Sequence, residues 1–342
     1  MADKVEQSEL RQDILTGNWV VIAPERGKKP VAIEERTENL RGLPLRDPDC
    51  PFCPGTKKSE GVRVVEEIRG DSGEWTTRVI ENKYKIFAAY DTCPTTLRAF
   101  TKHGPYSYYQ GCGDHYLVVE HREHNRVMGM MNDEEVKNVF RCYLSITRQF
   151  QNNPSNLISI VFKNQGRKAG ASQPHAHSQI VGSRVVPLWI RNALHMQERY
   201  FDQDGSCAMC DLVRFELEYG KRVLCDSSDA VVLSPYAAGN PYEVWVVPKR
   251  HFACFADIRD EEIATMAALV RKVLNRYVTL LNNPGFNYFV HTSPYPLSSV
   301  PFYHMYIQIV PRMKGVGGFE MGTHIPVNPV PPERVPDVLG SC

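Results

Sequence analysis

The stretch that decides the fold is His175-Ala176-His177-Ser178-Gln179-Ile180-Val181, which has a counterpart in His304-Met305-Tyr306-Ile307-Gln308-Ile309-Val310. Both segments begin with histidine, carry glutamine at their fifth position and end in two aliphatic residues. Because side chains alternate along a strand, His175, His177 and Gln179 would share one face. The recurrence of this pattern late in the chain indicates an internal duplication.

The same order of elements precedes both segments. Tyr116–Glu120 and Tyr242–Val247 have strand patterns, and each leads to a histidine, His124 or His251. The intervals from these histidines to the closing segments are 51 and 53 residues. Matching order, type and spacing favour two homologous units over a chance similarity.

A helix is predicted nine residues beyond each of these histidines, starting at Asp133 and Asp260. Acidic residues fill both first turns, where they complement the helix dipole. Asn132 and Glu135 have the spacing of a capping box at the first helix. Asn-Asn-Pro ends each helix, and a strand is predicted after it, over Leu157–Phe162 and Phe286–His291.

These patterns predict an α+β fold with two units whose antiparallel sheets join and carry helices packed on them. The units span residues 1–195 and 196–342, and the stretch Val185–Tyr200 connects them. A long insertion between Cys53 and His115 makes the first unit the larger one.

Composition describes a globular chain and narrows its partners. The 342 residues carry a net charge of +1, with 23% charged and 42% hydrophobic residues. This balance argues against a dedicated nucleic-acid binder. No stretch approaches the roughly 20 apolar residues of a membrane helix. The polar start, Met1–Leu10, is unlike a signal peptide, so we expect a cytoplasmic protein without a membrane partner.

The sequence contains two close cysteine pairs of the kind that binds metal. They are Cys50 and Cys53 in CPFC, and Cys207 and Cys210 in CAMC. Zinc prefers four nitrogen or sulfur ligands, and the repeat nominates two histidines for each pair. A redox or incidental role is the alternative for a lone pair, but two pairs with equivalently spaced histidines favour metal. The predicted structural sites are Cys50, Cys53, His124 and His175, and then Cys207, Cys210, His251 and His304. The remaining cysteines, and His103, His115, His121 and His195, are expected to be packed or solvated.

The predicted chemistry centres on His177. A neutral imidazole can attack phosphorus and form a phosphoramidate that an acceptor then discharges. Gln179 can donate a hydrogen bond to a phosphoryl oxygen. The preceding loop, Asn164–Ser172, suits a diphosphate through its glycines and polar groups, although a basic turn is the plainer alternative. Tyr306 stands where His177 stands, so only the first unit keeps the nucleophile.

These motifs resemble the galactose-1-phosphate uridylyltransferase family and the related ADP-glucose phosphorylases, a branch of the histidine-triad superfamily. The resemblance covers nearly the whole chain, from Leu10–Arg26 through CPFC, Glu81–Tyr84 and HAHSQ to Gly315–Glu320 and Asn328–Glu333. It implies two histidine-triad-like units in one half-barrel-like catalytic body.

The resemblance also implies roles for individual residues. His177 matches the family nucleophile, and Gln179 matches the glutamine that contacts the phosphoryl group. Other matches are phosphate contacts (Asn164, Gly170, Ser172), nucleotide contacts (Arg26, Asn82) and the sugar-phosphate segment (Lys314, Phe319, Glu320). In the family that last segment comes from the neighbouring subunit, which implies a homodimer. The first zinc site is typical of the family.

The leading functional hypothesis is a UDP-glucose–hexose-1-phosphate uridylyltransferase of galactose metabolism, with ping-pong transfer through nucleotidyl-His177. The alternative is an ADP-glucose phosphorylase, in which inorganic phosphate accepts an adenylyl group. Ala176 and Ser178 depart from the uridylyltransferase pattern His-Pro-His-Gly-Gln and favour that branch, whereas Lys314 favours the uridylyltransferases. A third hypothesis is a non-catalytic, zinc-stabilised nucleotide-binding protein.

Overall fold

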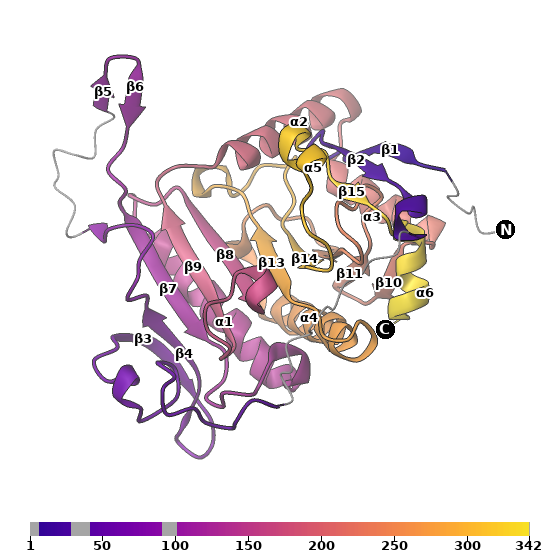
Figure 1. Cartoon of the computed structure of the whole chain (residues 1–342). Helices are drawn as coiled ribbons and strands as arrows, with labels where there is room; N and C mark the ends of the chain where they lie inside the picture. The colour runs from indigo at the N-terminus through magenta and orange to yellow at the C-terminus, as the bar shows by residue number, and fades with distance from the viewer. Residues whose placement is uncertain (1–6, 29–41, 91–100, 342) are drawn as a thin grey trace.

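The computed structural model describes residues 7–28, 42–90 and 101–341, and its centre is an open ten-stranded antiparallel sheet (Figure 1). The strands from the first half of the chain are, in spatial order, β3 (Val64–Arg69), β4 (Trp75–Glu81), β7 (Gly113–Val119), β9 (His177–Ser183) and β8 (Ile158–Gln165). The sheet continues with β13 (Phe286–His291), β14 (Tyr306–Pro311), β12 (Val244–Pro248), β11 (Ala230–Leu233) and β10 (Val223–Asp226).

The strand order is a repeat centred on the β8–β13 pair. From the centre outward, β8-β9-β7-β4-β3 in one half corresponds to β13-β14-β12-β11-β10 in the other. The two central strands pair antiparallel from Phe286 opposite Gln165 to Val290 opposite Val161. The predicted duplication and the joining of the two antiparallel sheets are therefore confirmed.

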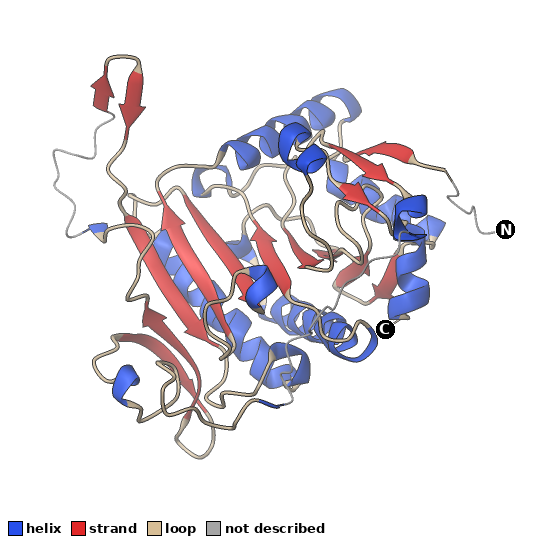
Figure 2. Ribbon diagram, viewed as in Figure 1, coloured by secondary structure: helices blue, strands red, loops and turns tan. Residues whose placement is uncertain are grey.

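Two long helices cover one face of this sheet, α1 (Asp133–Gln151) and α4 (Asp260–Leu280), and both begin at the predicted residue (Figure 2). The side chain of Asn132 accepts the Glu135 N–H, and the carboxylate of Glu135 accepts the Asn132 N–H, as a capping box requires. After α4, Asn282 and Asn283 take left-handed backbone conformations, with φ of 58° and 52°.

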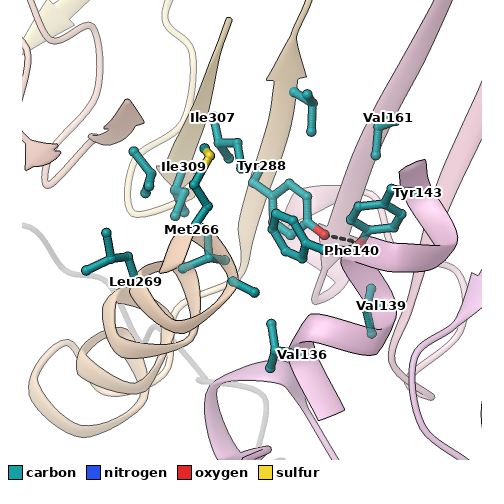
Figure 3. Close-up of a cluster of buried hydrophobic side chains, with 14 of the residues drawn as sticks. Val136, Val139, Phe140, Tyr143, Val161, Met266, Leu269, Tyr288, Ile307 and Ile309 are labelled. Atoms are coloured by element: carbon teal, nitrogen blue, oxygen red, sulfur yellow. Dashed lines mark hydrogen bonds between the residues drawn. The ribbon is translucent and has the colours of Figure 1, made fainter. Parts of the chain in front are cut away.

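The main core lies between these helices and the sheet (Figure 3). Helix α1 contributes Val136, Val139 and Phe140, and helix α4 contributes Met266 and Leu269, all buried. The hydroxyl groups of Tyr143 on α1 and Tyr288 on β13 share a hydrogen bond across the junction of the two halves. These buried side chains form the face that each helix packs against the sheet.

The opposite face of the sheet is covered mainly in its second half. Helix α2 (Leu188–Asp204) connects the two halves, and α3 (Ala208–Tyr219) follows it. The predicted boundary between residues 195 and 196 falls within α2. A second hydrophobic cluster forms here from Leu15, Met209, Trp245, Val247 and Tyr306, among others.

The beginning of the chain packs on the second half, which the sequence did not predict. Strands β1 (Glu9–Gln12) and β2 (Trp19–Ile22) form a small sheet in which β15 (Val327–Asn328) pairs parallel to β2. An ion pair of 2.9 Å joins Arg11 to Glu333. The N-terminal and C-terminal segments therefore lie together, as Figure 1 shows.

Smaller elements complete the described chain. A hairpin of β5 (Thr101–His103) and β6 (Tyr106–Tyr108) extends away from the body (Figure 1). Two short helices, α5 (Gly318–Thr323) and α6 (Val335–Leu339), lie near the C-terminus. Among the helices of residues 7–28, 42–90 and 101–341, none has the length and apolar character needed to span a membrane.

Replacing Asn132 by alanine should lower the free energy of unfolding by about 1 kcal/mol, because it removes the side-chain acceptor that caps α1. Urea denaturation followed by circular dichroism measures this change. The matched control is Arg259→Ala at the start of α4, where the side chain makes no cap hydrogen bond. That control should shift the free energy by less than about 0.5 kcal/mol. Equal losses in the two variants would contradict the capping role.

Candidate functional site

The first group of metal-ligating side chains comes from three separate segments of the first half. Cys50 and Cys53 lie in the loop before β3, His124 follows β7, and His175 precedes β9. All four are buried, and their ligand atoms lie within 4.8 Å of one another. The Nδ1 atom of His175 is 3.5 Å from the Cys50 sulfur and 3.6 Å from the Cys53 sulfur. The predicted quartet is therefore brought together.

The outward-facing ring nitrogen of His175 determines which tautomer is present. Its Nε2 lies 2.7 Å from the carbonyl oxygen of His121, so Nε2 carries the proton and donates it there. The Nδ1 lone pair then faces the two sulfur atoms. In His124, Nδ1 lies 3.5 Å from the Cys53 sulfur while Nε2 faces the carboxylate of Asp47 at 4.0 Å. Such outer partners orient metal-binding imidazoles.

The second half repeats this arrangement with Cys207, Cys210, His251 and His304, whose ligand atoms also lie within 4.8 Å of one another. The Nδ1 atoms of His251 and His304 are 3.5 and 3.4 Å from the Cys210 sulfur. The Nε2 atom of His304 donates to the carbonyl of Pro248 at 3.0 Å. Each group offers four nitrogen or sulfur donors, so either could hold a metal ion with no coordination position left for substrate.

His177 begins β9, two residues after the His175 ligand. Its Nδ1 lies 2.9 Å from the carbonyl oxygen of His175, so this nitrogen is the donor and Nε2 keeps its lone pair. Within the part of the chain that the structure describes, Nε2 makes no hydrogen bond. The ring of Phe52, from CPFC, packs against the imidazole with centroids 5.1 Å apart. Burial lowers the pKa of His177, which keeps the ring neutral near pH 7.

A buried ion pair lies on the face of β9 opposite to the His177 side chain. The ammonium of Lys163 contacts both carboxylate oxygens of Glu120 at 2.8 Å, and both side chains are completely buried. Lys163 also donates to the backbone carbonyl of His177 at 3.3 Å, and Ser178 donates to Glu120 at 2.6 Å. These bonds hold the first two residues of β9 from beneath.

Gln179 lies beside a histidine that the sequence left among packed or solvated residues. The Nε2 atom of His115 on β7 is 2.8 Å from Oε1 of Gln179. Asn82, predicted to line the nucleotide, places its Nδ2 within 3.3 Å of both ring nitrogens of His115. Among the other unassigned histidines, His103 and His195 are exposed, as expected. His115 itself is 2% exposed and belongs to the site.

The glycine-containing loop is held by the second half of the chain. Asn287 on β13 donates through Nδ2 to Oδ1 of Asn164 at 2.7 Å and to the carbonyl of Ala169 at 2.8 Å. Gly166 and Gly170 have φ of 86° and 88°, a conformation that suits glycine. The loop therefore presents a defined backbone beside β9, with Ser172 exposed at its end. Sequence reasoning missed Asn287 because it lies in the other unit.

The remaining predicted residues gather in a different place. Arg26, Lys314, Phe319 and Glu320 line one cavity of about 540 Å³, whose lining includes neither His177 nor Gln179. Lys314 contacts Glu320 at 2.5 Å, and Phe319 is 55% exposed. Arg26 reaches this cavity because β2, just before it, pairs with β15. The predicted site thus falls into two separate parts of one chain.

The second half has tyrosine at the position equivalent to His177. Tyr306 begins β14 as His177 begins β9, and it is buried against Trp245 and His291. The ring centroids of Tyr306 and His291 are 4.3 Å apart with planes inclined by 18°. Residues from α3 and the N-terminal segment fill the space on this face. A phenol lacks the basic ring nitrogen that His177 has.

Cysteines outside the two groups differ from their expected roles in part. Cys142 and Cys254 are free and buried, as expected for core residues. Cys112 and Cys225 are disulfide-bonded, which the sequence did not predict.

Comparison with known proteins shows a match over both halves. Residues 1–187 match the family model "Galactose-1-phosphate uridyl transferase, N-terminal domain", and residues 193–327 match the C-terminal domain model. An ADP-glucose phosphorylase of Arabidopsis thaliana is 33% identical, covering 98% of this chain and 94% of that protein. A galactose-1-phosphate uridylyltransferase of Thermotoga maritima is 25% identical, with coverages of 95% and 96%.

Similar folds are found among solved structures. The crystal structure of an ADP-glucose phosphorylase from Arabidopsis thaliana with bound ADP-glucose superposes with a TM-score of 0.83, at 31% identity and 98% coverage of both chains.

Substitution of one ligand in each Cys2His2 group should remove one metal ion per chain, because three remaining ligands bind metal more weakly. His175→Ala should empty the first group and His304→Ala the second, as measured by elemental analysis of the purified protein. His177→Gln is the matched control, since its side chain is not a ligand, and it should keep both ions. Loss of metal from that control, or wild-type protein without metal, would contradict the assignment.

Proposed function

Because the chain belongs to the galactose-1-phosphate uridylyltransferase family, we propose that it transfers a nucleoside monophosphate group from a nucleoside-diphosphate sugar to an acceptor through nucleotidyl-His177. The observation that carries the proposal is the Nδ1 hydrogen bond from His177 to the carbonyl of His175, which leaves Nε2 free to attack. This tautomer is the one that an imidazole nucleophile needs.

In the first step the Nε2 lone pair of His177 attacks the α-phosphorus of the nucleotide sugar. The new P–N bond forms as the bond to the bridging oxygen breaks, and the sugar 1-phosphate leaves with that electron pair. Gln179 donates to a non-bridging phosphoryl oxygen, where charge is concentrated during transfer. The carbonyl of His175, 2.9 Å from Nδ1, stabilises the positive charge that the ring acquires.

In the second step an oxygen of the acceptor attacks the same phosphorus. The P–N bond breaks, its electron pair returns to Nε2, and the neutral imidazole is restored. The loop Asn164–Ser172 would bind phosphate oxygens in both steps through backbone N–H groups and the Ser172 hydroxyl. The Asn164 amide is held by Asn287, so its nitrogen is directed by a bond that does not depend on substrate.

We propose that zinc fills both Cys2His2 groups. The two thiols and two imidazoles of each group match the donor set of structural zinc sites. Zinc when bound supplies structural cross-linking rather than a reactive water. His175 would connect the first ion to His177, because its imidazole would bind the metal while its backbone carbonyl accepts the hydrogen bond from His177 Nδ1.

Two nucleotides are candidates for the transferred group. The family model and the relative in Thermotoga maritima support uridylyl transfer from UDP-glucose to a hexose 1-phosphate. The 33% identity to an ADP-glucose phosphorylase over 98% of the chain supports adenylyl transfer from ADP-glucose to inorganic phosphate. Both reactions use the same first step at His177.

A cytoplasmic location stays a prediction.

We also propose that the active enzyme is a homodimer. The cavity with Arg26, Lys314, Phe319 and Glu320 is separate from the residues around His177. Apolar side chains are exposed beside it, with Val316 at 60%, Phe319 at 55% and Met321 at 68%. Such a patch suits contact with another protein surface. In a dimer, the residues of this cavity in one subunit would bind the sugar phosphate beside His177 of the other subunit and so complete the site.

Incubation with UDP-glucose or ADP-glucose, each without acceptor, should add one nucleotidyl group to the wild-type chain, because His177 can be modified but not discharged. Intact-mass spectrometry then identifies the group as uridylyl or adenylyl. His177→Gln should give no adduct and keep its fold. A chain that binds nucleotide but yields no adduct with either sugar would support the non-catalytic hypothesis and overturn this proposal.

Mixed dimers test whether the two parts of the site come from different subunits. His177→Gln and Lys314→Ala/Phe319→Ala chains should each be inactive alone, whereas their mixture should regain one intact site per mixed dimer. Activity of co-expressed, doubly tagged and purified dimers measures this recovery. A mixture as inactive as its components, or a wild-type chain that sediments as a monomer, would contradict the shared site.

A further inference from the structure

The two halves hold their equivalent glutamines in opposite orientations. Gln179 lies opposite Phe162 and Leu117 on its neighbouring strands, and Gln308 lies opposite Phe289 and Trp245. In the first half the amide oxygen is the atom 2.8 Å from His115. In the second half the amide oxygen is 2.8 Å from His291, while the nitrogen donates to Glu243 at 2.6 Å.

His115 and Glu243 stand at the same place in the duplication. His115 is two residues before Leu117 on β7, and Glu243 is two residues before Trp245 on β12. The imidazole of His115 can donate a hydrogen bond to the glutamine, whereas the carboxylate of Glu243 can only accept one. The amide therefore turns its oxygen toward His115 in one half and its nitrogen toward Glu243 in the other.

The protonation of His115 is decided by a backbone group. The N–H of Ile86 lies 3.1 Å from Nδ1, so Nδ1 is an acceptor and the proton is on Nε2. Asn82 is held by a backbone group as well, since its Oδ1 accepts the Tyr84 N–H at 2.9 Å. Its Nδ2 lies 3.3 Å from Nδ1 and 3.1 Å from Nε2 of His115. Because the Ile86 N–H occupies Nδ1, Nε2–H is left to donate to Oε1 of Gln179.

The amide nitrogen of Gln179 is consequently free for a ligand. Among the described residues no hydrogen bond uses this nitrogen, whereas both amide atoms of Gln308 are hydrogen-bonded. His291, two residues past Phe289, faces the far side of Gln308. The equivalent position in the first half is Asn164, two residues past Phe162. The free N–H groups thus face the strand that carries Asn164, beside His177.

We propose that His115 is a positioning residue that holds the Gln179 amide with its nitrogen toward the transferred phosphoryl group. The inference rests on the proposed function and assigns a role to a residue outside the HAHSQ motif. A phosphoryl group offers only acceptor oxygens, so an amide in the reversed orientation of Gln308 would place oxygen against oxygen. His115 fixes the orientation before substrate binds and removes the need for the amide to turn.

The test uses two side chains of nearly equal size at position 115. His115→Gln keeps an N–H donor near the place of Nε2, whereas His115→Glu supplies only acceptors, as Glu243 does in the second half. We expect nucleotidyl-His177 formation in single-turnover reactions to stay within about tenfold of wild type for H115Q. It should fall by about 100-fold or more for H115E, the usual cost of losing one donor to a developing oxyanion.

A double-mutant cycle separates positioning from a general effect of the added charge. In a Gln179→Ala background the difference between H115Q and H115E should vanish, because no amide remains to be turned. Thermal unfolding of each variant shows whether it is folded. Equal losses in H115Q and H115E, or a difference that persists without Gln179, would overturn the proposal.

Nitrogen NMR of histidine-labelled protein tests the same inference without using activity. Wild-type His115, identified by its loss in H115Q, should show the neutral Nε2–H tautomer with an unprotonated Nδ1. An Nδ1–H tautomer would overturn the proposal whether or not an adduct forms. If wild-type protein forms no adduct with either nucleotide sugar, the proposed function fails, and the tautomer still decides whether His115 donates to Gln179.

Discussion

Strand β8 shares backbone hydrogen bonds with β9 along one edge and with β13 along the other. Because an unpaired strand edge inside a protein leaves backbone groups unsatisfied, this double pairing determines how the two halves must sit. Two further contacts cross this junction of β8 with β13. They are the hydrogen bond between the Tyr143 and Tyr288 hydroxyl groups and the bonds from Asn287 to the loop Asn164–Ser172. The second half, which has Tyr306 at the position of His177, therefore helps to fix the loop beside His177.

Metal binding and the proposed chemistry meet in one residue. His175 turns one ring nitrogen toward two thiols, the other toward the carbonyl of His121, and its own carbonyl toward His177. The strand pleat returns His177 and Gln179 to the same face of β9, which is the face that α1 does not cover. Beneath them, Lys163 and Glu120 form a charge pair without solvent contact. Several independent bonds thus fix the orientation of a single imidazole.

The elements that sequence could predict are those with a local signal or a repeated one. The helix starting at Asp133 has its capping box, and both Cys2His2 quartets follow from spacing that occurs twice. His115 has no such signal, because its counterpart is Glu243 and the two residues differ in chemistry. The roles of the two positions are related only through their hydrogen bonds. His115 lies against the amide oxygen of Gln179, whereas Glu243 accepts from the amide nitrogen of Gln308.

Long-range pairing accounts for the other differences. Arg26 was grouped with the nucleotide residues by family resemblance, but its position depends on β2 pairing with β15, a contact that no local pattern announces. The unit boundary drawn near residue 195 is likewise a property of the sequence repeat, whereas the chain's first strands pack on the other unit.

That arrangement has a consequence for biosynthesis. Residues of β1 and β2 are synthesised long before their partners Asn328 and Glu333, because Arg11 and Glu333 lie 322 positions apart in the chain. Leu15 is a buried member of the cluster on the second half, so that cluster cannot be completed until Tyr306, another of its members, has been synthesised. A chain ending shortly before Val327 would keep the β1–β2 pairing but would lack both the parallel partner strand β15 and the ion pair of Arg11 with Glu333.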